Sequence, residues 1–346
     1  MKAVQILGPQ RIEVVELPKP IPGKKDILIR VKAVGLCGTD LELLRGEMPY
    51  IQQGFTTYPI IPGHEWSGIV EETGDEVKKF IPGDRVTGDV SIGCGECDYC
   101  KKGRFNLCAD RYEVGSYRNK DGAYAEYILM PAKHVYKLPE NVTLEEAALC
   151  EPAATAAYSV VKSGVGFGDT VLTIGDGPIG QLSMQCAKAV GAGKVILVGS
   201  WPEKMQIALN TGADQVISYR NEDVVKKVLD ITNGKGVDVV IENSGNPEAI
   251  EQSIKSVKMG GKIVLVSIYG KGKVPVDIDS VIINDVDIYG VLASPNTFAG
   301  TLALMGAGKI NVKPLITHQF PLEEIKKAIQ LVYERKEFRI KILLKP

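Results

Sequence analysis

The sequence predicts an α/β protein built from a mostly antiparallel β domain and a doubly wound parallel sheet. Its 346 residues, 45% of them hydrophobic, exceed the usual size of a single core, so we expect two domains. Up to about residue 150, short apolar alternations are broken by Gly and Pro, which is typical of antiparallel strands. From about residue 153 to 293, strand-like and helix-like segments alternate, which indicates parallel strands joined by right-handed crossovers.

We therefore expect one domain to comprise residues 1–152 and 294–346, and a second domain to comprise residues 153–293. The C-terminal segment includes an amphipathic helix, "LEEIKKAIQLVYE", and a final strand, "RIKILLKP". Both are expected to return to the first domain. The chain shows no internal repeat, low-complexity tract or flexible linker.

Composition and charge exclude two classes of partner. The chain has 41 basic and 42 acidic residues, with a formal net charge of -1 and no block of like charge. Nucleic acid and anionic membrane surfaces are therefore not expected partners. No segment approaches the roughly 18 to 20 unbroken apolar residues of a membrane span, and the N-terminus alternates like a strand. We expect a cytoplasmic protein that acts on a small molecule.

Four of the seven cysteines lie within one short segment, spaced C-x2-C-x2-C-x7-C, as Cys94, Cys97, Cys100 and Cys108. In a reducing compartment this spacing favours thiolate ligands of one metal over disulfides. Four ligands complete the tetrahedral shell of zinc and leave no position for substrate. We expect a structural zinc in a lobe spanning residues 89–112; the alternative is four free surface thiols, which would oxidise.

The segment from Gly175 to Gly180 reads G-x-G-x-x-G and follows the strand-like run "TVLTI". Glycines at the first two positions permit a tight turn and close approach to a pyrophosphate, and the third allows close packing of helix and strand. Strand, turn and helix in this order predict a dinucleotide site at Gly175, Gly177, Pro178, Ile179 and Gly180. The alternative is a plain glycine-rich turn.

The acid that favours NAD is missing from its usual place. About 20 residues beyond the glycines an Asp or Glu normally binds the adenosine ribose, but this chain has Gly199 there. Ser200 and Lys204 can offer a donor and a cation to a 2′-phosphate, and Tyr219 with Arg220 can close around the adenine end. We therefore expect NADP rather than NAD. The alternative is that Gly199 and Ser200 only form a turn and Trp201 covers the adenine.

A catalytic metal needs an open coordination position, and few donors remain for it. Cys37 lies in "GLCGTD", His64 and Glu65 lie in "IPGHEWSG", and Glu151 lies in "ALCEPAATA". Gly or Pro flanks each donor, as expected of loops. Taken singly, Cys37 and His64 are more often core residues than ligands, and the apolar surroundings of the other two histidines indicate packing or surface roles.

Together these motifs resemble the zinc-dependent medium-chain alcohol dehydrogenases, and more closely their sorbitol and threonine dehydrogenase branch. The likeness covers essentially the whole chain, through "GLCGTD", "GHEWSGIV", "DGAYAEY", "EPAATA" and "IGDGPIGQLSMQCAKAVGA". It implies a GroES-like catalytic domain and a Rossmann coenzyme domain. It also implies a catalytic zinc on Cys37 and His64, with Glu65 or Glu151 as the carboxylate ligand.

Further roles follow from the same resemblance. Thr39 matches the hydroxyl that passes the proton, and Asp40 supports the ligands. The segments that line the nicotinamide match Val266, Ser267, Ile268, Val291 and Leu292. The family also implies a homo-oligomer, either a dimer or a homotetramer.

The resemblance implies an NAD(P)-linked oxidoreductase that interconverts a secondary alcohol and its ketone by hydride transfer, with zinc as Lewis acid. The expected substrate is a polyol, sugar alcohol, polyol phosphate or cyclitol, with a ketose or related ketone as product. L-threonine and simple secondary alcohols are alternatives within the family. A zinc-free quinone or enoyl reductase, and a zinc-ribbon nucleotide-sensing binding protein, are the competing classes.

Overall fold

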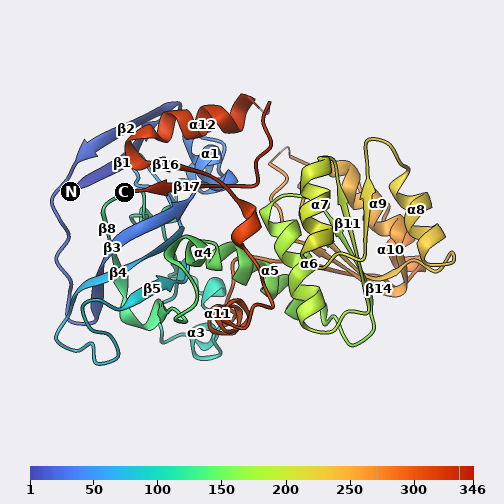
Figure 1. Cartoon of the computed structure of the whole chain (residues 1–346), viewed down its shortest axis with the longest axis horizontal. Coiled ribbons are helices and arrows are strands. Elements are labelled where there is room, and N and C mark those ends of the chain that lie inside the picture. The colour runs from blue at the N-terminus through green and yellow to red at the C-terminus, as the bar shows by residue number, and fades with distance from the viewer. Residues whose placement is uncertain (271, 335) are drawn as a thin grey trace. The chain divides into compact units, whose positions relative to one another are not determined.

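The computed structural model describes residues 1–270, 272–334 and 336–346. The chain forms two compact units (Figure 1). The first contains Met1–Glu151, Ala293–Gly306 and Leu315–Pro346, and the second contains Pro152–Leu292 and Ala307–Pro314. The predicted fold class is confirmed, since the first unit is mostly β and the second holds a parallel sheet.

The first unit is organised around a seven-stranded sheet in the order β16-β17-β3-β4-β5-β9, with β8 also pairing with β3. All of these pairs are antiparallel except β16 with β17. The strands of this sheet are β3 (Asp26–Gly35), β4 (Glu65–Thr73), β5 (Arg85–Gly88), β8 (Tyr127–Pro131), β9 (Val135–Lys137), β16 (Ile316–Pro321) and β17 (Lys341–Lys345).

Two small antiparallel pairs complete the β structure of this unit: β1 (Lys2–Gly8) with β2 (Arg11–Glu16), and β6 (Ser91–Ile92) with β7 (Tyr112–Glu113). Its helices are α1 (Gly38–Arg45), α2 (Pro49–Gln52), α3 (Asp98–Lys101), α4 (Leu144–Ala148), α11 (Phe298–Gly306) and α12 (Ile325–Glu334). Trp66 and Tyr124 are the largest fully buried side chains of the core that these elements enclose.

The second unit contains a six-stranded parallel sheet in the order β12-β11-β10-β13-β14-β15. Its strands are β10 (Thr170–Ile174), β11 (Lys194–Gly199), β12 (Gln215–Ser218), β13 (Val237–Glu242), β14 (Val257–Leu265) and β15 (Asp287–Gly290). The central strands are buried along almost their whole length, as expected of a sheet covered on both faces.

Helices cover both faces of this parallel sheet (Figure 1). α6 (Pro178–Ala189) and α7 (Pro202–Asn210) lie on one face, and α8 (Val224–Ile231), α9 (Pro247–Ser256) and α10 (Ile278–Ile283) lie on the other. α5 (Cys150–Ser163) carries the chain into this unit. The order of strands reverses between β10 and β13, so the chain leaves these two neighbouring strands toward opposite faces of the sheet. In doubly wound sheets, ligands bind at the carboxyl ends of the strands beside such a reversal.

The observed units differ from the expected domains mainly at one short segment. Residues 307–314 belong to the second unit, whereas the sequence placed all of 294–346 in the first. Asn311 explains the difference, because its N–H donates to Gln185 Oε1 at 2.6 Å and its carbonyl accepts from Gln185 Nε2 at 3.2 Å. Gln185 is a buried amide of α6, and its hydrogen-bonding groups need these partners.

Among the described residues, no helix combines the length and apolar character that a bilayer crossing demands.

Candidate active site

Three metal-binding side chains converge where β3 and β4 meet. One ligand atom each from Cys37, His64 and Glu65 lies within 4.8 Å of the others. Cys37 follows the end of β3 and caps the start of α1, while His64 directly precedes β4. Because β3 and β4 are antiparallel and Gly35 pairs with Glu65, the end of one strand is held beside the start of the other.

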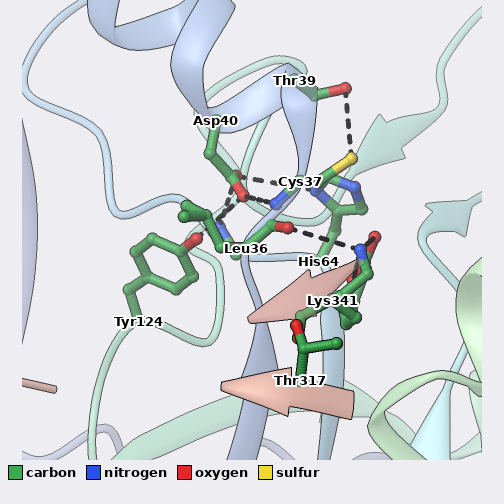
Figure 2. A network of polar contacts seen from close by, with 10 residues as sticks. Leu36, Cys37, Thr39, Asp40, His64, Tyr124, Thr317 and Lys341 are labelled. Carbon is green, nitrogen blue, oxygen red and sulfur yellow. Dashed lines mark hydrogen bonds and ion pairs between the residues drawn. The ribbon is translucent and has the colours of Figure 1, made fainter. Parts of the chain in front are cut away.

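Asp40 holds the two loops that carry these donors (Figure 2). Its carboxylate accepts the N–H of Cys37 at 2.9 Å and the N–H of Gly63 at 3.2 Å. The hydroxyl of Tyr124 donates to the same carboxylate at 2.9 Å. The Nδ1 atom of His64 lies 3.8 Å from it. Asp40 therefore fixes the positions of both loops without being one of the three converging donors.

The surroundings of His64 are electronegative. Burial acts to lower the pKa of its imidazole, but the Cys37 sulfur and the carboxylates of Asp40 and Glu151 raise the pKa well above its ordinary value. The buried Nδ1 atom has no hydrogen-bond partner among the described residues. A cation bound between Cys37, His64 and Glu65 would be stabilised by the same charges that favour the imidazolium.

A buried lysine lies on the far side of Glu65. Lys341 Nζ donates to Glu65 Oε1 at 2.7 Å, to Glu65 Oε2 at 2.6 Å, and to the carbonyl of Leu36 at 3.3 Å. Lys341 begins β17, which pairs with β3 at Gly35. Sequence analysis missed Lys341 and Tyr124. A lysine within the apolar run of the last strand is the signal that could have revealed the first.

Glu151 and Thr39 differ in how they relate to the cluster. Among the described residues, Glu151 is not part of the three-donor group; it lies buried in the first turn of α5 and acts on His64 through its charge. The expectation left Glu65 and Glu151 open, and this geometry favours Glu65. Thr39 Oγ1 lies 3.9 Å from Cys37 Sγ in the first turn of α1 (Figure 2).

The other predicted metal cluster also forms. One sulfur each from Cys94, Cys97, Cys100 and Cys108 lies within 4.8 Å of the others. The β6 and β7 pair closes the ends of this lobe, and Gly95 and Gly103 have positive φ angles of 88° and 71° that let the chain turn tightly.

Peptide N–H groups point at the sulfurs of this lobe. The N–H groups of Glu96 and Cys97 each lie 3.4 Å from Cys94 Sγ, and they lower the pKa of that thiol to about 6. Burial, together with the neighbouring thiols, raises the pKa of Cys100 to about 12. Without a cation the four sulfurs cannot all ionise, so a divalent metal is the partner that this arrangement fits.

The glycine loop between β10 and α6 has the geometry that its motif predicts. Gly175 has a φ of +117°. A Cβ on Gly180 would lie 1.9 Å from the Gly175 carbonyl oxygen, so only glycine fits where the helix packs on the loop. A Cβ on Gly177 would meet nothing within 4 Å, which leaves open space at the N-terminus of α6, where Pro178 and Ile179 begin the helix.

The remaining predicted coenzyme positions gather at one edge of the parallel sheet. Gly199 ends β11 and Ser200 follows it, Tyr219 follows β12, and Lys204 lies in the first turn of α7. Val266, Ser267 and Ile268 follow β14, and Val291 and Leu292 follow β15. Because all the strands are parallel, their carboxyl ends share the edge at which Gly175 lies.

One carboxylate at this edge was not foreseen. Asp176, the variable residue between Gly175 and Gly177, accepts the N–H of Ser200 at 2.7 Å and the N–H of Trp201 at 3.1 Å. Lys204 Nζ lies 3.7 Å from its other oxygen. Ser200 and Lys204, expected to serve a 2′-phosphate, therefore contact this carboxylate.

Comparison with known proteins identifies the family. Residues 23–140 match the model of the alcohol dehydrogenase GroES-like domain, and residues 178–318 match that of zinc-binding dehydrogenases. The chain is 33% identical over 346 residues to a sorbitol dehydrogenase of Bacillus subtilis, covering 100% of this chain and 97% of that protein. The chain belongs to the zinc-binding dehydrogenases.

Two further relatives agree with this membership. An L-threonine 3-dehydrogenase of Pyrococcus furiosus is 36% identical to this dehydrogenase over 349 residues, covering 100% of this chain and 98% of the relative. A zinc-binding dehydrogenase of Sinorhizobium meliloti, solved bound to NADP, superposes with a TM-score of 0.92 at 34% identity, covering 100% and 99% of the two chains. The resemblance inferred from the motifs is confirmed.

The residues of this dehydrogenase fit the two kinds of group that the family uses. Sulfur, nitrogen and carboxylate oxygen are the donors zinc prefers, and one of each converges here. Three protein ligands would leave a fourth position of a tetrahedral zinc for substrate. Four thiolates at the second cluster complete a closed shell. The open space at Gly177 fits the close approach of a pyrophosphate to the backbone.

Proposed function

We propose that this dehydrogenase interconverts a secondary alcohol and its ketone, and that its substrate is a polyol, sugar alcohol, polyol phosphate or cyclitol. The convergence of Cys37, His64 and Glu65 within 4.8 Å is the observation that carries the proposal. The similarity to a sorbitol dehydrogenase supports the polyol class. A zinc-free quinone or enoyl reductase would not need these three metal-binding side chains, so the donor set disfavours that class. Membership of the zinc-binding dehydrogenases likewise disfavours a zinc-ribbon nucleotide-sensing protein.

We assign a catalytic zinc to Cys37, His64 and Glu65, with Glu151 as a nearby carboxylate. A structural zinc is assigned to Cys94, Cys97, Cys100 and Cys108. When bound, the catalytic zinc supplies a Lewis acid for the substrate oxygen and the nicotinamide supplies a hydride acceptor. Ligand charge matters here, because one thiolate and one neutral imidazole leave a net positive site before a carboxylate joins them.

The side chains of this dehydrogenase then perform positioning and proton transfer. Thr39 Oγ1 takes up the proton of the alcohol and passes it outward. Asp40 keeps Cys37 and the loop before His64 in place through its hydrogen bonds to Cys37 and Gly63. Lys341 pairs with Glu65 and supplies the counter-charge that a buried carboxylate needs.

We propose that the glycine loop and the N-terminus of α6 bind the pyrophosphate of a nicotinamide dinucleotide. The residues after β14 and β15, namely Val266, Ser267, Ile268, Val291 and Leu292, are proposed to line the nicotinamide. Gly199 predicts NADP, and the Sinorhizobium meliloti relative is bound to NADP. This preference stays a prediction, and the contacts of Asp176 with Ser200 and Trp201 favour the opposite one.

A substrate panel with both coenzymes tests the proposal. Zinc-loaded enzyme is incubated with polyols, polyol phosphates, cyclitols and simple secondary alcohols, and reduced coenzyme is followed at its absorbance band. We expect oxidation of at least one member of the polyol, polyol phosphate or cyclitol classes, with a kcat/KM well above that for simple alcohols. Turnover of simple alcohols alone would overturn the substrate class and leave the reaction intact.

L-threonine is the second candidate substrate, because the threonine dehydrogenase relative is 36% identical across the whole chain. Its carboxylate and ammonium need charged partners that a polyol does not. Including L-threonine in the panel separates the two, since a kcat/KM for L-threonine above that of every polyol would replace the first candidate.

We also propose a homo-oligomer, a dimer or a tetramer, in the cytoplasm. β15 is an edge strand of the parallel sheet and carries the exposed Ile288, and α10, which precedes it in the chain, carries exposed isoleucines at positions 278, 282 and 283. An unpaired apolar edge of this kind is a template for pairing with a second copy. Size-exclusion chromatography with light scattering measures the mass, and a monomer at micromolar concentration would contradict the assembly.

A further inference from the structure

Gly199 is required for space and not for its backbone conformation. Its φ lies outside the left-handed region, so any residue could adopt the same backbone. A Cβ at this position, however, would lie 2.8 Å from Asp176 Cβ and 2.9 Å from Asp176 Oδ2. An acidic side chain at 199 and the observed position of Asp176 therefore exclude each other. The absence of an acid at the end of β11 goes together with the presence of one in the glycine loop.

The carboxylate of Asp176 is anchored at the end of β11. Its Oδ2 atom accepts the N–H of Ser200 at 2.7 Å, the N–H of Trp201 at 3.1 Å and the hydroxyl of Ser200 at 3.4 Å. These two peptide N–H groups hold the Asp176 carboxylate beside the end of β11, where an acid at position 199 would lie. The side chain is 14% exposed, so part of it is accessible at the carboxyl edge of the sheet.

The second carboxylate oxygen of Asp176, Oδ1, has weaker contacts than Oδ2. Lys204 Nζ lies 3.7 Å from Oδ1, which is an ion-pair distance and too long for a hydrogen bond. Oδ1 can therefore accept a hydroxyl from a ligand. The ribose of NAD offers two hydroxyl donors, whereas the ribose of NADP carries a phosphate in place of one of them.

We propose that Asp176 replaces the acid that is missing from the end of β11 and makes this dehydrogenase specific for NAD over NADP. The inference rests on the proposed coenzyme site and reverses the preference that Gly199 alone predicts. In this proposal the carboxylate that binds the ribose comes from the loop after β10 and not from the end of β11. Both positions lie at the same edge of the sheet.

Charge and hydrogen bonding both act against a 2′-phosphate here. The donors that would bind it, the N–H of Ser200, the hydroxyl of Ser200 and the ammonium of Lys204, already contact Asp176. A phosphate would have to displace the carboxylate or lie beside it as a like charge. Another cation, Arg220, has its guanidinium 6.0 Å from the centre of the Trp201 ring.

Equilibrium binding of NAD⁺ and NADP⁺ to the zinc-loaded enzyme, measured by calorimetry, tests the proposal without any substrate. We expect the wild type to bind NAD⁺ at least about tenfold more tightly than NADP⁺, because like-charge contact is costly. In Asp176→Ala the Kd ratio should shift toward NADP⁺ by at least about tenfold, since the freed donors become available to the phosphate. Adding Lys204→Ala to that variant should remove most of the gain.

Asp214→Asn is the matched control. Asp214 accepts the N–H of Val195 at 2.6 Å and pairs with Lys188 at 2.9 Å. Like Asp176, it therefore contacts a peptide N–H and a lysine, but it does so at the opposite end of β11. This substitution should leave the Kd ratio of the two nucleotides unchanged. If Asp176→Ala is poorly folded, Asp176→Asn removes the charge at nearly constant shape and should also shift the ratio toward NADP⁺.

Each outcome is decisive. Tighter binding of NADP⁺ by the wild type, or an unchanged ratio in both Asp176 variants, would overturn the role of Asp176. Failure of both nucleotides to bind would instead refute the proposed coenzyme site. Binding of NAD⁺ without oxidation of any alcohol would refute the proposed reaction and leave the specificity of Asp176 standing.

Discussion

Lys341 Nζ lies 2.6 and 2.7 Å from the two carboxylate oxygens of Glu65, and both side chains are buried. The pair joins the last strand of the chain to the strand that begins at the catalytic cluster. An intact buried ion pair adds little net stability, but removal of one partner leaves a charge without compensation. The main contribution of Lys341 to stability is therefore to avoid the free-energy penalty of burying the Glu65 carboxylate without a counter-charge.

We predict that Lys341→Met destabilises the metal-free enzyme by about 3 to 5 kcal/mol, because the Glu65 carboxylate loses its counter-charge. Zinc restores a positive charge beside Glu65, so the loss should be smaller in the zinc-loaded enzyme. Urea unfolding with and without chelator measures both values. Lys341→Arg keeps the charge and serves as the control; equal stability of the Met variant and the wild type without metal would contradict the role given to this pair.

The two zinc sites should be separable by mutation. We predict two zinc ions per wild-type chain by elemental analysis, and about one in Cys37→Ser, which should also lose turnover while NAD⁺ binding survives. Cys108→Ser should likewise lose one zinc, but its main effect should be a lower melting temperature, because a closed zinc contributes folding free energy. Wild-type activity in a Cys37→Ser enzyme lacking the catalytic ion would refute the site assignment.

Thr39 should affect proton transfer and little else. Its hydroxyl lies 3.9 Å from Cys37 Sγ, and it is assigned the first step of the proton path. We predict that Thr39→Val lowers kcat by about a hundredfold or more, as expected for loss of a proton-transfer group, while zinc content stays at the wild-type level. Thr39→Ser retains the hydroxyl and should recover most of the rate. Equal rates in the Val and Ser variants would argue against a proton role.

Two glycines of one loop should behave differently. We predict that Gly180→Ala costs about 1 to 3 kcal/mol of stability, because the new Cβ would clash with the Gly175 carbonyl oxygen at 1.9 Å. Gly177→Ala has open space and an ordinary φ of -74°, so stability should change by less than about 0.5 kcal/mol. Its effect should appear as weaker coenzyme binding, which titration measures. Unchanged affinity in Gly177→Ala would show that the pyrophosphate lies elsewhere.

Acid should weaken the second unit partly through Asp238. Although burial acts to raise the pKa of Asp238, its hydrogen bonds with Lys258 and the N–H of Thr170 lower the pKa below the ordinary value of 3.8. A lowered folded-state pKa contributes stability that is present above pH 3.8 and is lost as the pH falls through the folded value. Asp238→Asn should therefore be less stable than the wild type at pH 7.

The difference between Asp238→Asn and the wild type should shrink below about pH 4, which urea unfolding at several pH values can follow. Because Asp238 is partly exposed, the gap at neutral pH should be about 1 kcal/mol or less. A gap that stays constant down to pH 3 would contradict the linkage.

Local patterns in the sequence predicted a large part of this molecule. Alternating strands and helices predicted the parallel sheet, and the glycines of 175–180 predicted the strand, turn and helix on which they lie. The spacing of four cysteines within residues 94–108 predicted their convergence, since nearby residues on tight turns have few ways to arrange four sulfurs. These features depend on residues that are close together in the chain. Hydrophobic periodicity and the spacing of cysteines and glycines therefore reveal them directly.

Pairings between distant residues had no such signal. Lys341 and Glu65 are separated by 276 positions, and only the pairing of β17 with β3 beside β4 brings them together. The same holds for the proximity of Glu65, rather than Glu151, to Cys37 and His64. It also holds for residues 307–314, which group with the second unit although the sequence pattern assigned them to the first domain. Gly199 alone predicts NADP, and the contacts of Asp176 with Ser200 and Trp201, which no local pattern signals, are the basis for proposing NAD instead.

The sequence by itself determined the fold class, the glycine turn, the closed thiolate lobe and the identity of the donors available to a metal. Tertiary structure alone decided which carboxylate lies close to Cys37 and His64, which cation pairs with it, and which acid accepts the N–H groups that follow β11. The physical reason is that hydrogen bonding and burial depend on distances of a few ångströms in space, and the separation of residues along the chain does not specify these until the strands have paired.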